Sequence, residues 1–220
     1  MHVADLSPPY LIVKPGKSED DFYRLADEDS DWEYLDGRII MHSPASFQHE
    51  NLFSFLLTLL RTYLDEKGGG IALGSRFPMR LDSRWSPEPD IMVVGEERRH
   101  QITKQRLEGP ADFVIEIASE SDPRLDLREK LPRYQEAQIE EIWLIDPFRQ
   151  ELVQVVRQDS GYISRSYSQG QVNSQAVEGF WIKSQWLWQE SLPSVLACLR
   201  QLPDGSGSFT QSRKVAKNAK

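Results

Sequence analysis

An acidic residue interrupts one of the most apolar runs of this chain and limits the structures that the run can adopt. Residues 113–118 have the sequence FVIEIA, so Glu116 stands among branched and aromatic side chains that are typical of a buried strand. A buried carboxylate is costly unless it is hydrogen-bonded or paired with a cation. Asp90 precedes a second apolar run, residues 91–94, although an aspartate after a proline is also common in turns. The pair suggests a site at the edges of two strands, with a divalent metal ion as one possible partner.

Composition predicts one folded domain with a tail. The 220 residues are 39% apolar and 10% aromatic, which is enough for one core. We expect an N-terminal extension over residues 1–17, a domain over 18–203 and a disordered basic tail over 204–220. A single cysteine, Cys198, excludes an intrachain disulfide and is expected to be a buried small hydrophobe. No apolar stretch is long enough to cross a bilayer, so we expect a cytoplasmic protein without a membrane partner.

Hydrophobic periodicity predicts helices and strands in an α+β order. Asp36-Gly37 favours a tight hairpin turn between strands at 32–35 and 38–41. Helices are expected over 50–64 and 126–137, the second opened by a capping box at Asp126 and kinked by Pro132. Further strands are expected at 71–81, 90–94, 113–118, 141–145, 151–156 and 162–167, with a helical turn within 95–110 and a C-terminal packing element over 179–202.

The order of short motifs resembles the Uma family of restriction-endonuclease-like proteins, which belongs to the PD-(D/E)XK nuclease superfamily. The resemblance covers roughly residues 20–195. It implies an α+β fold of the α/β/α type, with a mixed β-sheet flanked by helices and an N-terminal β-hairpin extension. The motifs are YLDG at 34–37, SPAS at 43–46, EPD at 88–90, GPADFVIEI at 109–117, EKLPRY at 129–134 and EIWLIDP at 141–147.

The resemblance also implies a set of site residues. Asp90 and Glu116 would be the metal ligands, and the backbone carbonyl of Ile117 would complete the protein's share. Mg²⁺ suits such sparse oxygen ligation because it keeps several waters, and Mn²⁺ is expected to substitute for it. Glu50, at the start of the long helix, matches a catalytic acid of the first helix in such nucleases, although the helix macrodipole favours a glutamate there in any case. Its neighbour His49 is expected to be a surface or supporting residue.

The superfamily's lysine normally lies two residues after the second acid, where this chain has Ala118. The resemblance offers Lys130, from the following helix, as its catalytic replacement. Its role would be to activate water and to offset charge on the phosphate. The alternative is a solvated helix residue that pairs with Asp126 one turn earlier.

A net charge of −8 argues against indiscriminate nucleic-acid binding, so any phosphate contacts must come from a local patch. For Tyr134, packing in the core is the simpler interpretation. The candidates for phosphate contact are Arg124, Arg128, Arg133 and Tyr134.

Three functions remain open. The first is a Mg²⁺-dependent nuclease that hydrolyses DNA phosphodiester bonds, with DNA as its partner and a homodimer or higher homo-oligomer as its expected state. The second is a catalytically inactive protein of the same fold that binds nucleic acid or a protein. The third is hydrolysis of a substrate other than DNA, because a fold does not fix a substrate.

Overall fold

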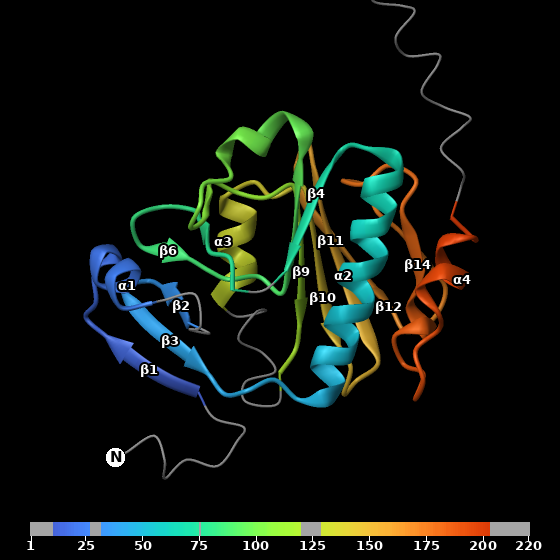
Figure 1. Ribbon diagram of the computed structural model, residues 1–220, viewed down its shortest axis with the longest axis horizontal. Coiled ribbons are helices and arrows are strands. Elements are labelled where there is room, and N and C mark those ends of the chain that lie inside the picture. Colours follow the sequence, from blue (N-terminus) through green and yellow to red (C-terminus); the bar gives the residue numbers. More distant parts are fainter. Residues whose placement is uncertain (1–10, 27–31, 75, 120–128, 203–220) are drawn as a thin grey trace, which may run out of the picture.

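A mixed sheet of six strands forms the centre of the protein, for which the computed structural model describes residues 11–26, 32–74, 76–119 and 129–202 (Figure 1). The strand order is β12-β11-β10-β9-β7-β4, in which β9 and β10 run parallel and all other neighbours are antiparallel. The two central strands of the sheet are therefore parallel. Its strands are β4 (Gly70–Gly74), β7 (Ile91–Gly95), β9 (Phe113–Ile117), β10 (Glu141–Asp146), β11 (Glu151–Gln158) and β12 (Gly161–Tyr167).

Helices cover both faces of this sheet. The long helix α2 (Phe47–Lys67) packs on one face, and the short helix α3 (Leu131–Glu136) lies on the other (Figure 1). Successive strand residues point to opposite faces. Phe113, Ile115 and Ile117 accordingly join the core with α2, whereas Val114 packs with Tyr134 of α3. The alternation places Glu116 on the α3 face.

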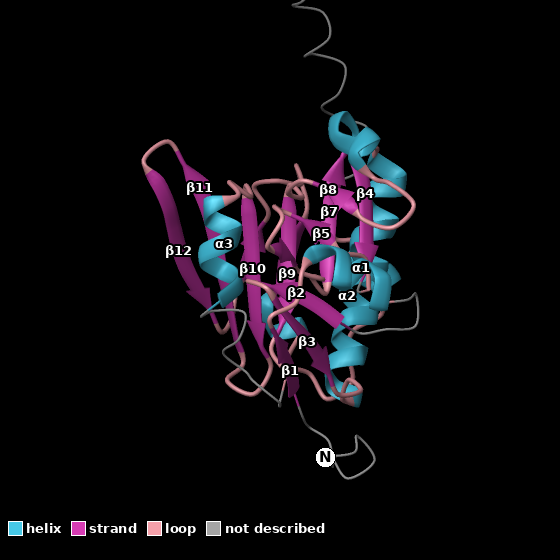
Figure 2. Cartoon of the chain, turned by 90° about the vertical axis from the view of Figure 1, so that its left-hand side faces the viewer, coloured by secondary structure: helices cyan, strands magenta, loops and turns pink. Residues whose placement is uncertain are grey.

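A second sheet of four strands lies on the α3 side of the central sheet (Figure 2). Its order is β1-β3-β2-β6, so residues 11–15 of the expected N-terminal extension pair with the hairpin. Asp36 and Gly37 both have positive φ, as a type I′ turn requires, and the predicted hairpin is confirmed. The elements are β1 (Leu11–Pro15), α1 (Glu19–Leu25), β2 (Trp32–Leu35), β3 (Arg38–His42) and β6 (Trp85–Ser86), and the short pair β5 (Met79–Arg80) and β8 (Leu107–Glu108) lies nearby.

One expectation about local structure is wrong, and a second is tested only in part. The strand expected over 71–81 is divided into β4 and β5, which belong to different sheets. The helix expected over 126–137 is described only from its later part, where α3 begins at Leu131, and Asp126 lies outside the described residues. Pro132 is the second residue of α3, and the kink expected from it stays a prediction because the preceding turn lies outside the described residues. The helical turn expected within 95–110 is the 3₁₀ segment η2 (Glu96–Gln101).

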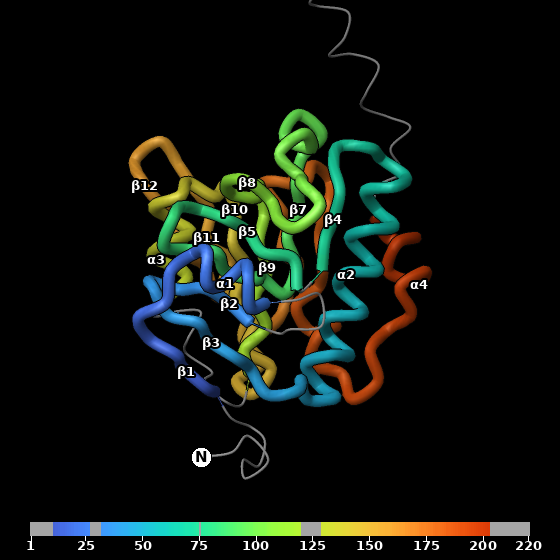
Figure 3. Tube along the Cα trace, turned by 60° about the vertical axis from the view of Figure 1, so that its left-hand side comes forward, coloured from blue at the N-terminus to red at the C-terminus, as the bar shows by residue number. Residues whose placement is uncertain are grey.

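The C-terminal part of the domain packs against α2 and the sheet face beneath it. Phe180 stacks near Trp143 of β10, and Cys198 is fully buried as expected. Figure 3 shows α4 running beside α2, away from β1 and β3. No helix in the described part of the chain is long and apolar enough to span a membrane. The elements are β13 (Gln171–Asn173), β14 (Trp181–Lys183), η4 (Ser184–Trp186) and α4 (Val195–Leu199).

Glu141 ties this C-terminal part to the sheet. Its side chain is 0% exposed, so each of its oxygens must be satisfied within the protein. The carboxylate bonds directly to side chains of β10 and β11 and to the loop that follows β13. Its donors are Trp143 Nε1, Gln154 Nε2, Ser174 Oγ and the backbone N–H groups of Gln175 and Ala176, at 2.6–2.9 Å.

Replacement of Glu141 by alanine is expected to lower the free energy of unfolding by about 3–5 kcal/mol, because it leaves several buried donors without an acceptor. Urea unfolding followed by circular dichroism measures this change. Glu140→Ala is the matched control, since the adjacent glutamate is exposed and should change stability by less than about 0.5 kcal/mol. Equal effects of the two substitutions would contradict the structural role given to Glu141.

Candidate active site

The two acids singled out by the sequence meet at one edge of the central sheet. The antiparallel register of β7 and β9 pairs Ile91 with Ile115, and its continuation by one residue sets Asp90 opposite Glu116. Residues opposite one another share a face of the sheet. The backbone N–H of Asp90 donates to Glu116 Oε2 at 3.4 Å, and the N–H of Ile117 donates to Asp90 Oδ2 at 2.7 Å. The carboxylate of Glu116 is thus bonded to the backbone of Asp90, and the carboxylate of Asp90 is bonded to the backbone of β9.

Glu116 is 2% exposed and accepts hydrogen bonds from Tyr134 of α3 and from Lys130, the residue directly before α3. The hydroxyl of Tyr134 donates to Glu116 Oε1 at 2.5 Å, and the Lys130 ammonium donates to the same oxygen at 3.2 Å. Burial and the Glu116 carboxylate raise the pKa of Tyr134 well above its ordinary value, so the hydroxyl remains a donor. Tyr134 has no exposed surface, which supports the core-packing interpretation and makes the predicted phosphate contact wrong.

Lys130 lies between two carboxylates that come from different sheets. Its side chain is 5% exposed, with the ammonium 2.7 Å from Glu33 Oε1 of β2 and 3.2 Å from Glu116 Oε1. Glu33 also accepts a bond from the backbone N–H of Glu88 and contacts His42 Nε2, both at 3.0 Å. Burial alone would raise the pKa of Glu33, but Lys130 and His42 together lower it to about 2. The alternative of a solvated Lys130 is therefore wrong.

His49, in the first turn of α2, contacts one of the two acids, Asp90. Ser46 caps this helix by accepting the backbone N–H of His49, which fixes the direction of the turn. His49 Nε2 lies 3.3 Å from Asp90 Oδ1. The side chain of Glu50 is exposed, and its catalytic role stays a prediction. Of the two expectations for His49, a surface residue or a supporting one, this contact with Asp90 agrees with the supporting role.

The remaining phosphate candidates lie apart or outside the described residues. The guanidinium of Arg133 lies over the ring of Trp85, 4.8 Å from its centroid, and pairs with Glu136 at 2.5 Å. Arg124 and Arg128 lie outside the described part of the chain. Only Nη1 of Arg133 is bonded to Glu136, so a phosphate contact from Arg133 stays a prediction.

The arrangement of oxygens fits a hard divalent cation. In a strand the N–H and C=O of one residue point to the same side, so the carbonyl of Ile117 faces Asp90 as its N–H does. The carboxylates of Asp90, Glu116 and Glu33 with the Lys130 ammonium give a formal charge of −3 + 1 = −2, which a divalent ion would neutralise. No group of three His, Cys, Asp or Glu side chains with ligating geometry is found among the described residues, so water would complete the coordination shell.

Sequence reasoning missed Glu33. The segment 32–35 has the sequence WEYL, which places a glutamate in an apolar strand just as FVIEIA does. The turn residues Asp36 and Gly37 predicted the hairpin, but no partner was predicted for the carboxylate of Glu33 in its first strand. The rule that a buried carboxylate needs a cation, applied to Glu33, would have marked it as a site candidate.

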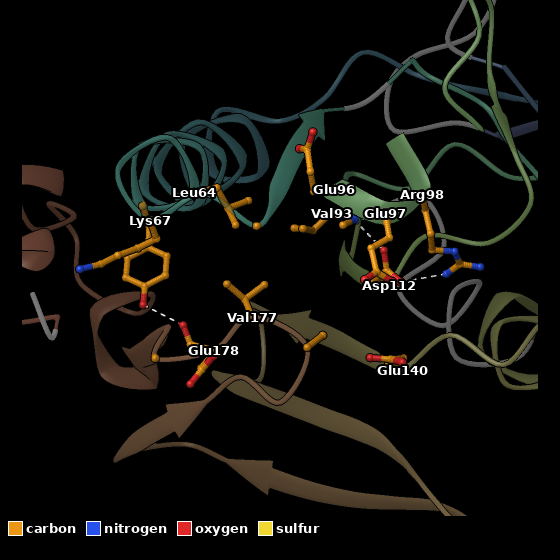
Figure 4. Close-up of a pocket in the computed structure, with 16 residues that line it drawn as sticks. Leu64, Lys67, Val93, Glu96, Glu97, Arg98, Asp112, Glu140, Val177 and Glu178 are labelled. Carbon is orange, nitrogen blue, oxygen red and sulfur yellow. Dashed lines mark hydrogen bonds and ion pairs between the residues drawn. The ribbon is translucent and has the colours of Figure 1, made fainter. Parts of the chain in front are cut away.

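A separate cavity lies beside Gly95, the last residue of β7, whereas Asp90 precedes the first residue of this strand. Its volume is about 510 Å³, and it opens between the end of α2, the end of β7 and the loop before β14 (Figure 4). Tyr63, Leu64, Val93 and Val177 give it an apolar floor, and none of the predicted site residues lines it.

A mixed sheet flanked by helices, with two acids at the edges of adjacent strands, defines the restriction-endonuclease-like class of fold. The family model Uma2, described as putative restriction endonuclease, matches residues 19–185, and the chain belongs to this family.

A solved structure supports the same fold. The crystal structure of a putative nuclease belonging to DUF820 from Anabaena variabilis ATCC 29413 matches with a TM-score of 0.67 and 17% sequence identity. The match covers 78% of this chain and 97% of that chain. At this identity the similarity shows the fold alone. No curated protein matches the chain.

Proposed function

We propose that this protein is a nuclease that hydrolyses DNA phosphodiester bonds and depends on Mg²⁺, which Mn²⁺ can replace. The observation that carries the proposal is the convergence of Asp90, Glu116 and Lys130 on one face of the sheet. Membership of a family described as putative restriction endonuclease points to the same chemistry. The site residues come from three segments that are distant in sequence, as expected for a site built by the fold.

Each side chain has a distinct part in the proposed reaction. Asp90, Glu116 and the Ile117 carbonyl would hold the metal ion. When bound, the ion would polarise a phosphoryl oxygen and make a water more acidic. Tyr134 keeps Glu116 oriented through its hydroxyl. Lys130 adds a positive charge beside these ligands and offsets the negative charge that develops on the phosphoryl group during attack.

The test is incubation of purified protein with plasmid DNA and with single- and double-stranded oligonucleotides. We expect cleavage in Mg²⁺ or Mn²⁺ and none in EDTA. Absence of cleavage of every DNA substrate, by protein that is folded and binds Mn²⁺, would contradict the proposal. RNA and nucleotide substrates in parallel would reveal hydrolysis of a substrate other than DNA.

A second candidate is a protein of this fold that binds nucleic acid or a protein without cutting. Two features favour it: the net charge of −8, and Ala118 at the usual lysine position. It predicts that the protein binds DNA more tightly in Mn²⁺ and releases no cleavage product.

For the nuclease we further propose a cytoplasmic location and a homodimer or higher oligomer, since two sites suit cleavage of both strands.

A further inference from the structure

The ammonium of Lys130 forms an ion pair with a glutamate of the four-stranded sheet as well as with one of the central sheet. Its shorter contact, 2.7 Å, is to Glu33 of β2, whereas Glu116 of β9 lies at 3.2 Å. The glutamate of the four-stranded sheet is thus the nearer of the two carboxylates that hold this lysine.

Glu33 is itself fixed in place by further contacts. One oxygen accepts the backbone N–H of Glu88, two residues before Asp90, and the other contacts His42 of the neighbouring strand β3. A single buried carboxylate therefore joins the hairpin, the segment that leads into Asp90, and Lys130.

The residues around Lys130 are attached to the same sheet. Arg38 of β3 forms an ion pair with Glu129, and Arg133 lies over the ring of Trp85 in β6. Residues 129–133 are thus held by strands of the four-stranded sheet at three successive points. Figure 1 shows this sheet on the α3 side of the protein.

A lysine in this location needs such attachment. A lysine two residues after Glu116 would be fixed by the strand itself, but this chain has Ala118 there and supplies Lys130 from the start of a short helix. The lysine side chain is a flexible stem with several rotatable bonds. Buried carboxylates on both sides restrict where its ammonium can lie.

We propose that Glu33 is a positioning residue that holds the Lys130 ammonium against Glu116, so that the four-stranded sheet is a working part of the site. The inference rests on the proposed function for its catalytic consequence. The contact itself can be tested without any reaction.

The first experiment is a double-mutant cycle in metal-free protein with Glu33→Gln, Lys130→Met and both together. We expect Glu33→Gln to lower the melting temperature clearly when Lys130 is present and much less when it is methionine, because the interaction is then already lost. An equal drop in both backgrounds would overturn the proposal. The cycle requires no activity, so it remains decisive if wild-type protein cleaves nothing and the proposed function fails.

The second experiment separates positioning from general loosening of the sheet. Glu33→Gln is expected to lower kcat about 10- to 100-fold, with KM and the Mn²⁺-induced rise in melting temperature nearly unchanged. Glu19→Gln, in α1, is the matched control, because it removes the ion pair with Arg80 of β5 without touching Lys130, and it should leave kcat unchanged. Equal losses in the two variants would overturn the proposal.

If Glu33→Gln does not fold, Arg38→Gln takes its place. It removes the ion pair to Glu129, whose side chain is partly exposed, and it leaves Glu33 intact. We expect a smaller fall in kcat at unchanged KM. An unchanged kcat in this variant would contradict positioning of Lys130 by the four-stranded sheet.

Discussion

Lys130→Met is expected to lower the rate of DNA cleavage by about 10²–10³-fold while the protein still binds Mn²⁺. The ammonium contributes charge in the transition state and is not a metal ligand, so chemistry is lost and binding is kept. Stability should also fall, by about 3–5 kcal/mol, because Glu33 and Glu116 lose the cation buried between them. The measurements are cleavage rates at saturating Mn²⁺ and melting temperatures with and without the ion.

An exposed lysine supplies the control for this prediction. Lys104 lies in the loop before β8, and Lys104→Met should leave both rate and stability near wild type. A Lys130→Met protein that cleaves as fast as wild type would remove Lys130 from the mechanism. The nuclease proposal would then require another cation.

Asp90→Asn is expected to abolish both cleavage and stabilisation by metal. The amide oxygen can still accept the Ile117 N–H, so the fold should survive while the charge that attracts the ion is lost. At 100 times its dissociation constant, Mn²⁺ should stabilise wild-type protein by about 2.7 kcal/mol and the variant by almost nothing. Thermal unfolding over a range of Mn²⁺ concentrations measures this difference.

Asp146→Asn is a well-matched control for Asp90→Asn. Asp146 ends β10, and its side chain is 17% exposed, against 15% for Asp90. It accepts backbone N–H groups of the following turn and has no contact with the two acids among the interactions of the described residues. Loss of Mn²⁺ stabilisation in both variants would indicate a general effect of charge rather than a defined site.

Short sequence patterns predicted the hairpin, the long helix and the buried acid Glu116, because each depends on residues that are close together in the chain. Asp36-Gly37 specified the hairpin because few residues tolerate the positive φ values of a type I′ turn. The apolar spacing over 50–64 identified α2, which extends a few residues further at each end. Glu116 was recognisable because a charge inside a buried strand needs a partner, and its partners Tyr134 and Lys130 lie on the helix side of that strand.

Contacts between residues far apart in the chain could not be predicted from the sequence. Nothing local to Glu33 indicates that its partner is Lys130, because the contact exists only when two sheets and α3 come together. The division of 71–81 into β4 and β5 likewise depends on pairing with β7 and β8. The choice between a surface and a supporting role for His49 stayed open for the same reason, since a single histidine at a helix start carries no spacing signal before Asp90 is placed beside it.

The most direct test of the central claim is a crystal structure of the protein grown with Mn²⁺ and measured at the manganese absorption edge. We expect one strong anomalous peak between the carboxylates of Asp90 and Glu116, near the Ile117 carbonyl, with the Lys130 ammonium still paired with Glu33. Occupied manganese sites elsewhere, with none between these two acids at saturating Mn²⁺, would contradict the proposed metal-dependent nuclease site.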